Sequence, residues 1–308
     1  MGNNKVVVLM STYNGEKFIR EQIDSILHQK NVTVEIIIRD DCSTDSTIDI
    51  LQEYSTKYNN ITLIKGKENL KPAKSFFWLM ENYSDSDYFA LSDQDDVWDS
   101  DKLECAINMI NQENNNIPLL YYSNLRIVDQ NLTFYRNSHS SPHISRNKYA
   151  AFIENLATGC TIVYNRRMAQ LIKQKKPCNF SMHDAWLYLV GAVFGKNIYD
   201  YEPHICYRQH ENNVIGTRLK KASWSAYIAR EFNRFTNRNL QPRYDNAVEF
   251  LREFGTELSE NDLKKVLEVV NYKRTRKTRN LLMNDQDIIP KDRFNRFRIR
   301  TLIRLGIV

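Results

Sequence analysis

The sequence is poor in the residues and segments that mark several classes of protein. It contains only 9 glycines in 308 residues and no glycine-rich stretch near the amino end, so the phosphate loop of a nucleotidylyltransferase is missing. Its five cysteines are odd in number and form no C-x-x-C pair, which argues against a disulfide framework or a zinc ribbon. No apolar run reaches the roughly 18 residues of a membrane-spanning helix, and no signal-peptide core precedes the first strand-like run. We therefore expect a protein of the reducing cytoplasm that is neither secreted nor integral to the membrane.

Charge is distributed unevenly along the chain. The formal net charge is +6, yet residues 271–308 contain 11 Lys plus Arg against 3 Asp. This leaves 32 basic and 34 acidic residues in the first 270. With 42% hydrophobic residues, the chain can bury one large core, or a core with a smaller appendage. A nearly neutral body thus carries a basic carboxyl end, which is either a solvated surface or a surface for an anionic partner.

Strand-like and helix-like segments alternate over the first hundred residues. The predicted strands are 5–10, 34–38, 61–64 and 88–91, and the predicted helices between them are 16–29, 48–58 and 73–81. Such alternation predicts an α/β fold with a mostly parallel central sheet flanked by helices, and ligands bind at the carboxyl ends of the strands of such sheets.

The pattern becomes mixed further along the chain. We expect strands near 119–122, 159–164 and 198–205 and a helix over 183–194. Beyond about Gly216 the sequence is helical, basic and aromatic, which places a soft boundary there.

Three carboxylates follow the fourth predicted strand, in the run Asp93-Gln94-Asp95-Asp96. Carboxylates this close repel one another unless a cation lies among them. Oxygen ligands of this kind suit Mg²⁺ or Mn²⁺, and a diphosphate commonly completes the coordination. An acidic turn, or a cap for a helix over 102–109, explains the run equally well.

Two features at the ends of the first two strands fit a nucleotide. Tyr13 offers an aromatic face on which a base can stack. The pair Asp40-Asp41 can hydrogen-bond a base or ribose, for example by accepting the imide N–H of uracil or thymine. Helix capping and an ordinary loop tyrosine are the alternatives.

These motifs together resemble the amino-terminal half of glycosyltransferase family 2, whose members have the GT-A fold. The resemblance rests on Ser11-Thr12-Tyr13-Asn14-Gly15, Asp40-Asp41-x-Ser43-Thr44-Asp45 and Asp93-x-Asp95-Asp96. The longer strings at 91–98, 182–186 and 207–213 are similar to the bacterial rhamnosyltransferase-like branch of the family. The resemblance covers about residues 5–215. It implies a catalytic domain over 1–215, with a nucleotide-binding half to about 118 and an acceptor half from about 119, followed by a basic helical region over 216–308.

The resemblance assigns the nucleoside to the first two loops. It implies that Tyr13 stacks on the base, that Asp41 bonds the base edge with Asp40 beside it, and that the loop at Ser11 and Thr12 contacts the nucleoside. Lys74 falls where the family often places a basic residue facing the nucleotide, and Lys71 is an alternative for that position.

The resemblance assigns the diphosphate and the metal to the acidic run and to a later segment. Asp93 would face the ribose or the donor sugar, and Asp95 would bind Mn²⁺ or Mg²⁺, with Asp96 adjusting the site. His210 would supply a further metal or phosphate contact, and Arg208 would neutralise diphosphate charge.

Asp184 resembles the general base of the family. In a single in-line displacement the acceptor hydroxyl must lose its proton as the new bond forms, and a carboxylate within about 3 Å can accept that proton. The leaving diphosphate needs charge stabilisation instead, which a divalent ion and Arg or Lys supply. We expect His183 to have only a structural place at the start of its helix, and we expect Trp98 and Trp186 either to line a sugar pocket or to pack in the core.

Aromatic and basic residues recur at helical spacing beyond residue 216. They comprise Trp224, Tyr227, Ile228, Phe232 and Phe235 among Lys220, Lys221, Arg230 and Arg234, followed by the arginine-rich segment 294–304. A basic amphipathic helix can lie on an anionic leaflet with its apolar face inserted. A helical cap on the catalytic domain or a dimer surface is the alternative. Nucleic acid is not expected, because no recognisable module is present and the acidic loops oppose it.

The sequence therefore predicts an inverting glycosyltransferase that uses dTDP-L-rhamnose in bacterial polysaccharide or cell-wall glycan synthesis. Its acceptor would be a glycan or a lipid-linked saccharide, at the cytoplasmic face of the membrane. The same fold with a UDP-hexose donor stays open. A non-catalytic nucleotide-sugar-binding scaffold is disfavoured because Asp93, Asp95 and Asp184 are all present.

Overall fold

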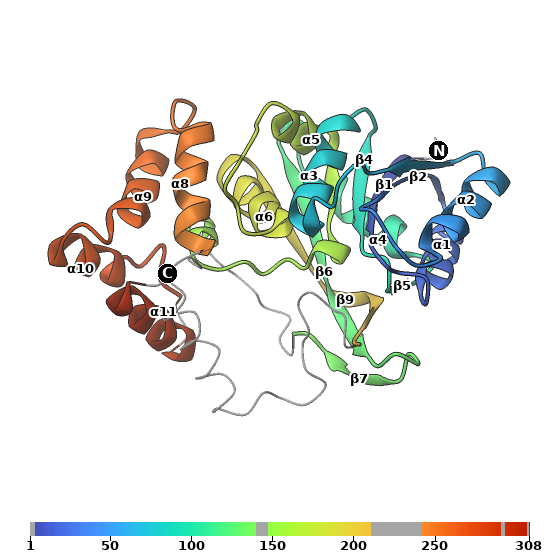
Figure 1. Ribbon diagram of the computed structural model, residues 1–308. Helices are drawn as coiled ribbons and strands as arrows, with labels where there is room; N and C mark the ends of the chain where they lie inside the picture. The colour runs from blue at the N-terminus through green and yellow to red at the C-terminus, as the bar shows by residue number, and fades with distance from the viewer. Residues whose placement is uncertain (1–3, 140–146, 211–241, 291–292, 307) are drawn as a thin grey trace. The chain divides into compact units, whose positions relative to one another are not determined.

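The computed structural model describes residues 4–139, 147–210, 242–290, 293–306 and 308 (Figure 1). The chain forms two compact units. Unit 1 comprises residues 1–144, 157–174 and 194–219, and unit 2 comprises residues 145–156, 175–193 and 220–308. The predicted domain boundary at 215/216 lies outside the described residues and stays a prediction.

Unit 1 is built on a mixed sheet with the strand order β3-β2-β1-β4-β8-β6-β9-β5, and β7 pairs with β6. The strands are β1 (Asn4–Thr12), β2 (Val32–Asp40), β3 (Ile61–Lys65), β4 (Tyr88–Ser92), β5 (Val97–Trp98), β6 (Leu119–Val128), β7 (Phe134–Asn137), β8 (Val163–Asn165) and β9 (Lys196–Arg208). The strands β1 to β4 are parallel, as predicted, and β4 pairs antiparallel with β8.

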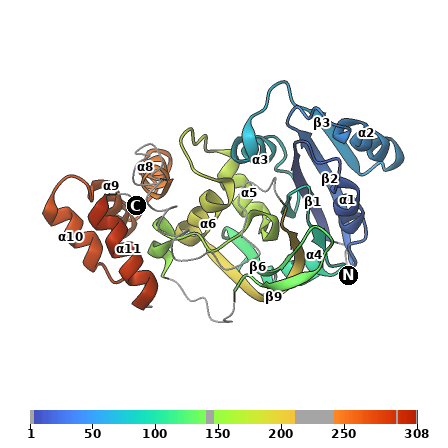
Figure 2. The ribbon, with the colours of Figure 1, turned by 60° about the horizontal axis from the view of Figure 1, so that its bottom comes forward.

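Helices cover both faces of the sheet. They are α1 (Ile19–Leu27), α2 (Thr47–Lys57), α3 (Lys71–Asn82), α4 (Lys102–Ile110) and α5 (Arg166–Lys173). Figure 2 shows α1 and α2 on one side of β1, β2 and β3, with α3 on the other side. The apolar runs of these strands are buried because both faces of the sheet are covered.

The sheet departs from the sequence prediction in its second half. The segment predicted as a strand over 159–164 forms a 3-10 turn (Gly159–Thr161) and only then the short strand β8. The two-residue strand β5 was not predicted, because so short a segment shows no periodicity. β9 begins at Lys196 and pairs parallel with β6 and antiparallel with β5.

Gly195 connects α6 (His183–Phe194) to β9 at a point of close packing. A Cβ atom at this position would lie 1.8 Å from the carbonyl oxygen of Pro118, which also accepts the N–H of Lys196. We therefore expect Gly195→Ala to lower the free energy of unfolding by about 3 kcal/mol, because backbone would have to move. Chemical denaturation measures this change. Lys196→Ala, which removes a surface ion pair with Glu113, should cost less than about 1 kcal/mol. Equal stability of the two variants would contradict the close packing.

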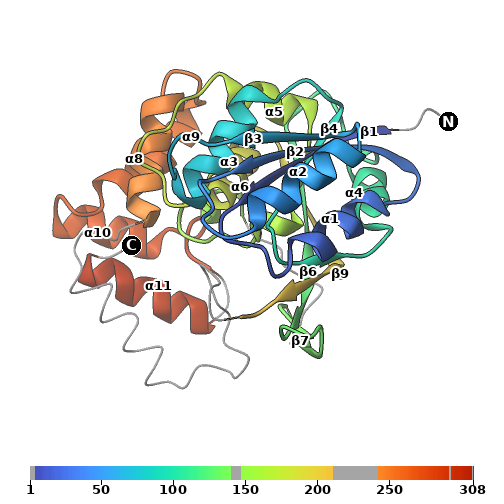
Figure 3. The same cartoon turned by 45° about the vertical axis from the view of Figure 1, so that its right-hand side comes forward.

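Unit 2 is helical in its described parts. It contains a 3-10 helix (Lys148–Phe152), residues 183–193 of α6, and the helices α8 (Pro242–Phe254), α9 (Glu260–Asn271), α10 (Arg276–Asn284) and α11 (Arg293–Leu305). α8 packs on α9, α9 on α10 and α10 on α11 (Figure 3). Trp186 is fully buried against Phe250 and Phe254. Trp186 therefore packs in the core, which was one of its two predicted places.

The apolar face of the basic carboxyl-terminal helix α11 is buried. Ile299, Leu302 and Ile303 of α11 are buried, which corresponds to the alternative of a packed helical cap for these residues, and contact with a membrane stays a prediction. The aromatic stretch from Trp224 to Phe235 lies outside the described residues. Among the helices that the structure describes, none is long and apolar enough to cross a membrane.

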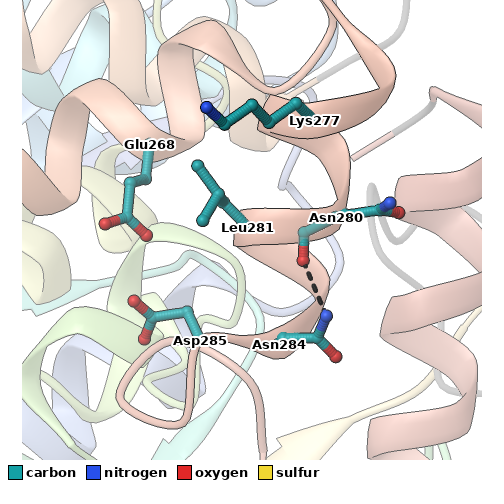
Figure 4. A pocket seen from close by; sticks show the side chains of 6 residues that line it. All are labelled: Glu268, Lys277, Asn280, Leu281, Asn284 and Asp285. Atoms are coloured by element: carbon teal, nitrogen blue, oxygen red, sulfur yellow. Dashed lines mark hydrogen bonds between the residues drawn. The ribbon is translucent and has the colours of Figure 1, made fainter.

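An open hollow of about 620 Å³ lies beside α9 and α10 (Figure 4). It is lined by Glu268, Lys277, Asn280, Leu281, Asn284 and Asp285. Burial and the neighbouring Asp285 raise the pKa of Glu268, whereas Asp285 is paired with Lys265. The hollow contains none of the residues predicted to act on a donor or an acceptor.

Candidate active site

The loops after β1, β2 and β4 meet at the carboxyl edge of the parallel strands. The register places Thr12 beside Asp40 and Met10 beside Ser92. The ends of these strands and the loops that follow them thereby contain most of the predicted donor-binding residues, namely Ser11, Thr12, Tyr13, Asp40, Asp41 and Asp93, together with the predicted metal ligand Asp95.

The loop after β1 is held by the loop after β2. The N–H of Asn14 donates to Ser43 Oγ (2.9 Å), and the N–H of Gly15 donates to Thr47 Oγ1 (2.8 Å). Asn14 itself lies in the left-handed region (φ 49°), which asparagine tolerates better than most residues. The ring of Tyr13 is 46% exposed on this fixed backbone. Its stacking on a base stays a prediction.

Gln94 joins the loop after β1 to the acidic loop after β4. Its Oε1 accepts the N–H of Tyr13 (2.8 Å) and its Nε2 donates to the carbonyl of Tyr13 (3.0 Å). A Cβ on Gly15 would lie 2.5 Å from Gln94 Oε1, so a larger residue at position 15 would displace this side chain from its present position. Sequence reasoning missed the role of Gln94. No spacing rule reveals a side chain that pairs with backbone 81 residues away.

Asp40 organises the loop from within. It is 1% exposed. Its Oδ1 accepts from Thr12 Oγ1 (3.0 Å) and Ser43 Oγ (2.5 Å), and its Oδ2 accepts the N–H of Ser43 (2.9 Å). These bonds correspond to the capping alternative for this residue, and a direct contact with the donor stays a prediction.

Asp41 holds the start of α3. Its carboxylate accepts the N–H groups of Leu70 (2.9 Å) and Lys71 (2.8 Å) and pairs with the buried Arg39. Lys71 thereby keeps a left-handed backbone (φ 68°), and Lys74 is exposed in the first turn of the helix. A bond from Asp41 to a base edge stays a prediction.

Ser11 also points toward α3. Its Oγ donates to Ser75 Oγ at 2.7 Å, and Ser75 accepts from Arg39 at 3.1 Å. Ser11, Asp41 and Lys74 therefore surround the amino end of one helix, a position that favours negative charge.

Asp95 and His210, the two predicted metal ligands, are neighbours. His210 Nε2 lies 2.7 Å from Asp95 Oδ2, and both side chains are largely buried. The ring of Phe18 packs beside His210 with a centroid distance of 5.0 Å. Carboxylate oxygen suits Mg²⁺ and Mn²⁺, and the imidazole nitrogen is the commonest metal ligand of proteins, so this pair can hold a divalent ion.

Arg208 fixes the backbone of the acidic loop. Its Nε donates to the carbonyl of Asp95 (2.8 Å), and its other guanidinium nitrogens contact Glu21 and the carbonyl of Gln130. Its backbone N–H donates to Asp96 Oδ1 (3.1 Å). Arg208 is 2% exposed, and its contact with a diphosphate stays a prediction.

Two buried ionisable groups support the acidic loop. Burial, together with Asp95 and Asp93, raises the pKa of Asp96 well above its usual value. Burial lowers the pKa of Lys102 to about 7, and its ammonium lies 3.5 Å from the centroid of the buried Trp98 ring. Burial therefore favours the uncharged form of both buried side chains, Asp96 and Lys102.

Asp184 lies in unit 2, in the first turn of α6. It is 8% exposed, and its Oδ1 accepts the N–H of Ala185 (2.6 Å). Burial lowers the pKa of the adjacent His183 to about 3, so that imidazole is neutral, in agreement with a structural place. The role of Asp184 as the base stays a prediction.

Comparisons with known proteins show which family this chain resembles. The family described as glycosyl transferase family 2 matches residues 7–172. The dTDP-rhamnosyl transferase RfbG of Shigella flexneri is 34% identical over 230 residues, which cover 68% of this chain and 74% of that protein.

Two solved structures are similar in fold. S. aureus TarS 1–349 in complex with UDP has a TM-score of 0.54 at 16% identity, covering 92% of this chain and 75% of that one. The mannosyltransferase PcManGT from Pyrobaculum calidifontis, in complex with GDP-Man and Mn²⁺, has a TM-score of 0.53 at 14% identity, covering 99% and 85%. The predicted GT-A fold is confirmed by this likeness.

Proposed function

This chain belongs to glycosyl transferase family 2, and we propose that it is a metal-dependent, inverting enzyme that transfers a sugar from a nucleoside-diphosphate donor to an acceptor hydroxyl. The observation that carries the proposal is the Asp95–His210 pair at 2.7 Å, beside loops that leave the Tyr13 ring exposed.

The nucleotide would bind where the loops after β1 and β2 meet. Tyr13 would stack on the base, while Asp40 and Asp41 keep the surrounding backbone in place. Lys74 is exposed at the amino end of α3, and it would face the phosphates together with that helix terminus.

Asp95 and His210, with Asp93 beside them, would hold Mn²⁺ or Mg²⁺. Bound there, the ion neutralises charge on the leaving diphosphate. Arg208 keeps the backbone carbonyl of Asp95 in place.

Asp184 would act on the acceptor. As the acceptor oxygen attacks the anomeric carbon, the bond from that carbon to the diphosphate oxygen breaks, and the Asp184 carboxylate accepts the hydroxyl proton. Attack on the face opposite the leaving group inverts the anomeric centre. The base and the ion therefore do separate work.

The donor that we favour is dTDP-L-rhamnose, because the relative named a dTDP-rhamnosyl transferase is 34% identical to this chain. A UDP-hexose remains the alternative, since a relative named as a UDP-Glc-dependent glucosyltransferase, WfgD of Escherichia coli, is 30% identical over 169 residues. The acceptor would be a glycan or lipid-linked saccharide of bacterial polysaccharide or cell-wall synthesis.

Peripheral contact with an anionic membrane would use the outer face of α11. Arg293 and Arg304 are exposed on this helix, Arg300 is half-buried, and Phe297 is 70% exposed. Helical spacing places these four residues on one face, and arginines attract anionic headgroups. This placement differs from the sequence prediction, in which the apolar face inserts.

Donor hydrolysis tests the proposed function without knowledge of the acceptor. We expect slow release of dTDP from dTDP-L-rhamnose in the presence of Mn²⁺ or Mg²⁺, and none after chelation with EDTA. Chromatography of the nucleotide products measures this release. Equal release with EDTA would contradict metal dependence. Release of nucleotide only from UDP-sugars would mean that the donor is a UDP-sugar.

Gln94→Ala should weaken donor binding about 10-fold, because it removes two hydrogen bonds that fix Tyr13 beside the acidic loop. Gln94→Glu should not restore binding, because its second oxygen would face the carbonyl of Tyr13. Calorimetry with dTDP and Mn²⁺ measures both variants. Gln52→Ala, a change of an exposed glutamine on α2, is the matched control. Unchanged affinity of Gln94→Ala would rule out this positioning role.

A further inference from the structure

A second cluster of metal-ligating side chains lies in unit 1 where α4 begins beside β9. Asp101 precedes the first residue of α4, Cys105 follows one turn later, and His204 extends from β9. A carboxylate oxygen, the thiol sulfur and an imidazole nitrogen of these residues all lie within 4.8 Å of one another. His204 Nδ1 is 3.4 Å from Asp101 Oδ1.

The other nitrogen of His204 faces a second carboxylate. His204 Nε2 is 3.3 Å from Asp200 Oδ2. Asp200 is in turn held by the hydroxyl of Tyr121 (2.8 Å) and the N–H of Glu202 (2.9 Å). Metal-bound histidines almost always donate their free N–H to a carboxylate, a carbonyl or water, which fixes the tautomer and the ring. The arrangement around His204 has this form.

The charges around the cluster favour a cation. One carboxylate faces each ring nitrogen of His204: Asp101 lies 3.4 Å from Nδ1 and Asp200 lies 3.3 Å from Nε2. Two negative groups this close to one ring stabilise positive charge there, and a divalent ion beside Asp101 can supply it.

We propose that Asp101, Cys105 and His204 bind a transition-metal ion of the Zn²⁺ type. The three side chains offer oxygen, sulfur and nitrogen, the donor set that zinc accepts in tetrahedral sites, and a water molecule would take the fourth position. A thiolate ligand disfavours Mg²⁺ and Mn²⁺, so this site would not compete for the ion of the Asp95–His210 pair. Asp101 is half exposed, which leaves a path for the ion.

An ion at this position would join the two segments that support the acidic loop. α4 follows β5 after a short turn, and β5 pairs with β9 through Val97 and Cys206. β9 then continues to Arg208, which holds the backbone of Asp95. The ion would therefore act as a structural link that stabilises unit 1, and it takes no part in transfer.

Cobalt binding to the full-length protein tests this proposal. After removal of metals with a chelator, we expect one Co²⁺ ion per chain to give a thiolate-to-cobalt charge-transfer band, and Zn²⁺ to displace that ion and raise the melting temperature. The band should disappear in Cys105→Ser and in His204→Gln. Asp200→Asn should weaken Co²⁺ binding by about 10- to 100-fold, because it removes only the support of the histidine.

Two control variants separate this site from the rest of the chain. Cys178→Ser changes an exposed cysteine of unit 2 and should keep the band. Asp95→Ala should also keep it, so that failure of the proposed catalytic metal site and failure of this one are distinguishable. A wild-type protein without the band, or a Cys105→Ser variant that retains it, would overturn the proposal.

Discussion

Replacing Asp184 with asparagine is expected to lower the rate of sugar transfer by about 10²- to 10⁴-fold, the usual contribution of a positioned general base. Asparagine has nearly the same shape, and its Oδ1 can still accept the N–H of Ala185, so folding should be preserved. It cannot take the proton of the acceptor hydroxyl. Steady-state kinetics with donor and acceptor measures the loss, and donor affinity should stay close to that of the wild type.

The matched control for this change is Asp245→Asn. Asp245 also lies in the first turn of a helix of unit 2, in α8, and no role in transfer is assigned to it. We expect normal turnover from this variant. Turnover near normal in Asp184→Asn as well would mean that another group accepts the proton, and the assignment of Asp184 would be wrong.

Asp95→Ala should abolish the effect of metal on donor binding. The variant removes the carboxylate that contacts His210. Because a bound divalent ion contributes several kcal/mol through charge stabilisation, we expect transfer to fall at least about 100-fold. Affinity for the donor without metal should change little, because the loop that carries Tyr13 is held separately by Ser43 and Thr47. Calorimetric titrations with and without Mn²⁺ separate the two contributions.

Asp87→Ala serves as the control for Asp95→Ala. Asp87 directly precedes β4, the strand whose other end leads into the acidic loop, and it makes a surface ion pair with Arg166. Such pairs contribute about 0–1 kcal/mol to stability, so this variant should bind donor and metal normally. Unchanged metal dependence in Asp95→Ala would mean that other residues hold the ion.

The parallel half of the sheet was predictable because its physical signal is local. The runs of β1 and β2 are buried on both faces, so they appear in the sequence as continuous apolar segments. β5 is two residues long and takes its place from pairing with β9. Gly159 begins a 3-10 turn within a segment whose residues favour a strand. Tertiary contacts determine the structure of these two segments, and the strand propensity of their residues carries no information about those contacts.

Some roles in the candidate site could be predicted from the sequence, whereas others could not. Asp95 and His210 are 115 positions apart, and only the resemblance to a family linked them in advance. The internal roles of Asp41 and Arg208, and the bridge made by Gln94, depend on which backbone groups lie within hydrogen-bonding distance. A sequence shows which groups can donate or accept, whereas the fold determines which partners they meet.

Binding of nucleotide sugars with and without metal tests the central claim most directly. Calorimetric or thermal-shift titrations would compare dTDP-L-rhamnose, UDP-glucose, UDP-galactose and free dTDP, each with Mn²⁺, with Mg²⁺ and with EDTA. The account predicts metal-dependent binding of dTDP-L-rhamnose that exceeds the binding of dTDP and is lost in Asp95→Ala. Preference for a UDP-sugar would keep the mechanism and change the donor, and a protein that binds none of these nucleotides under any condition would contradict the proposed function.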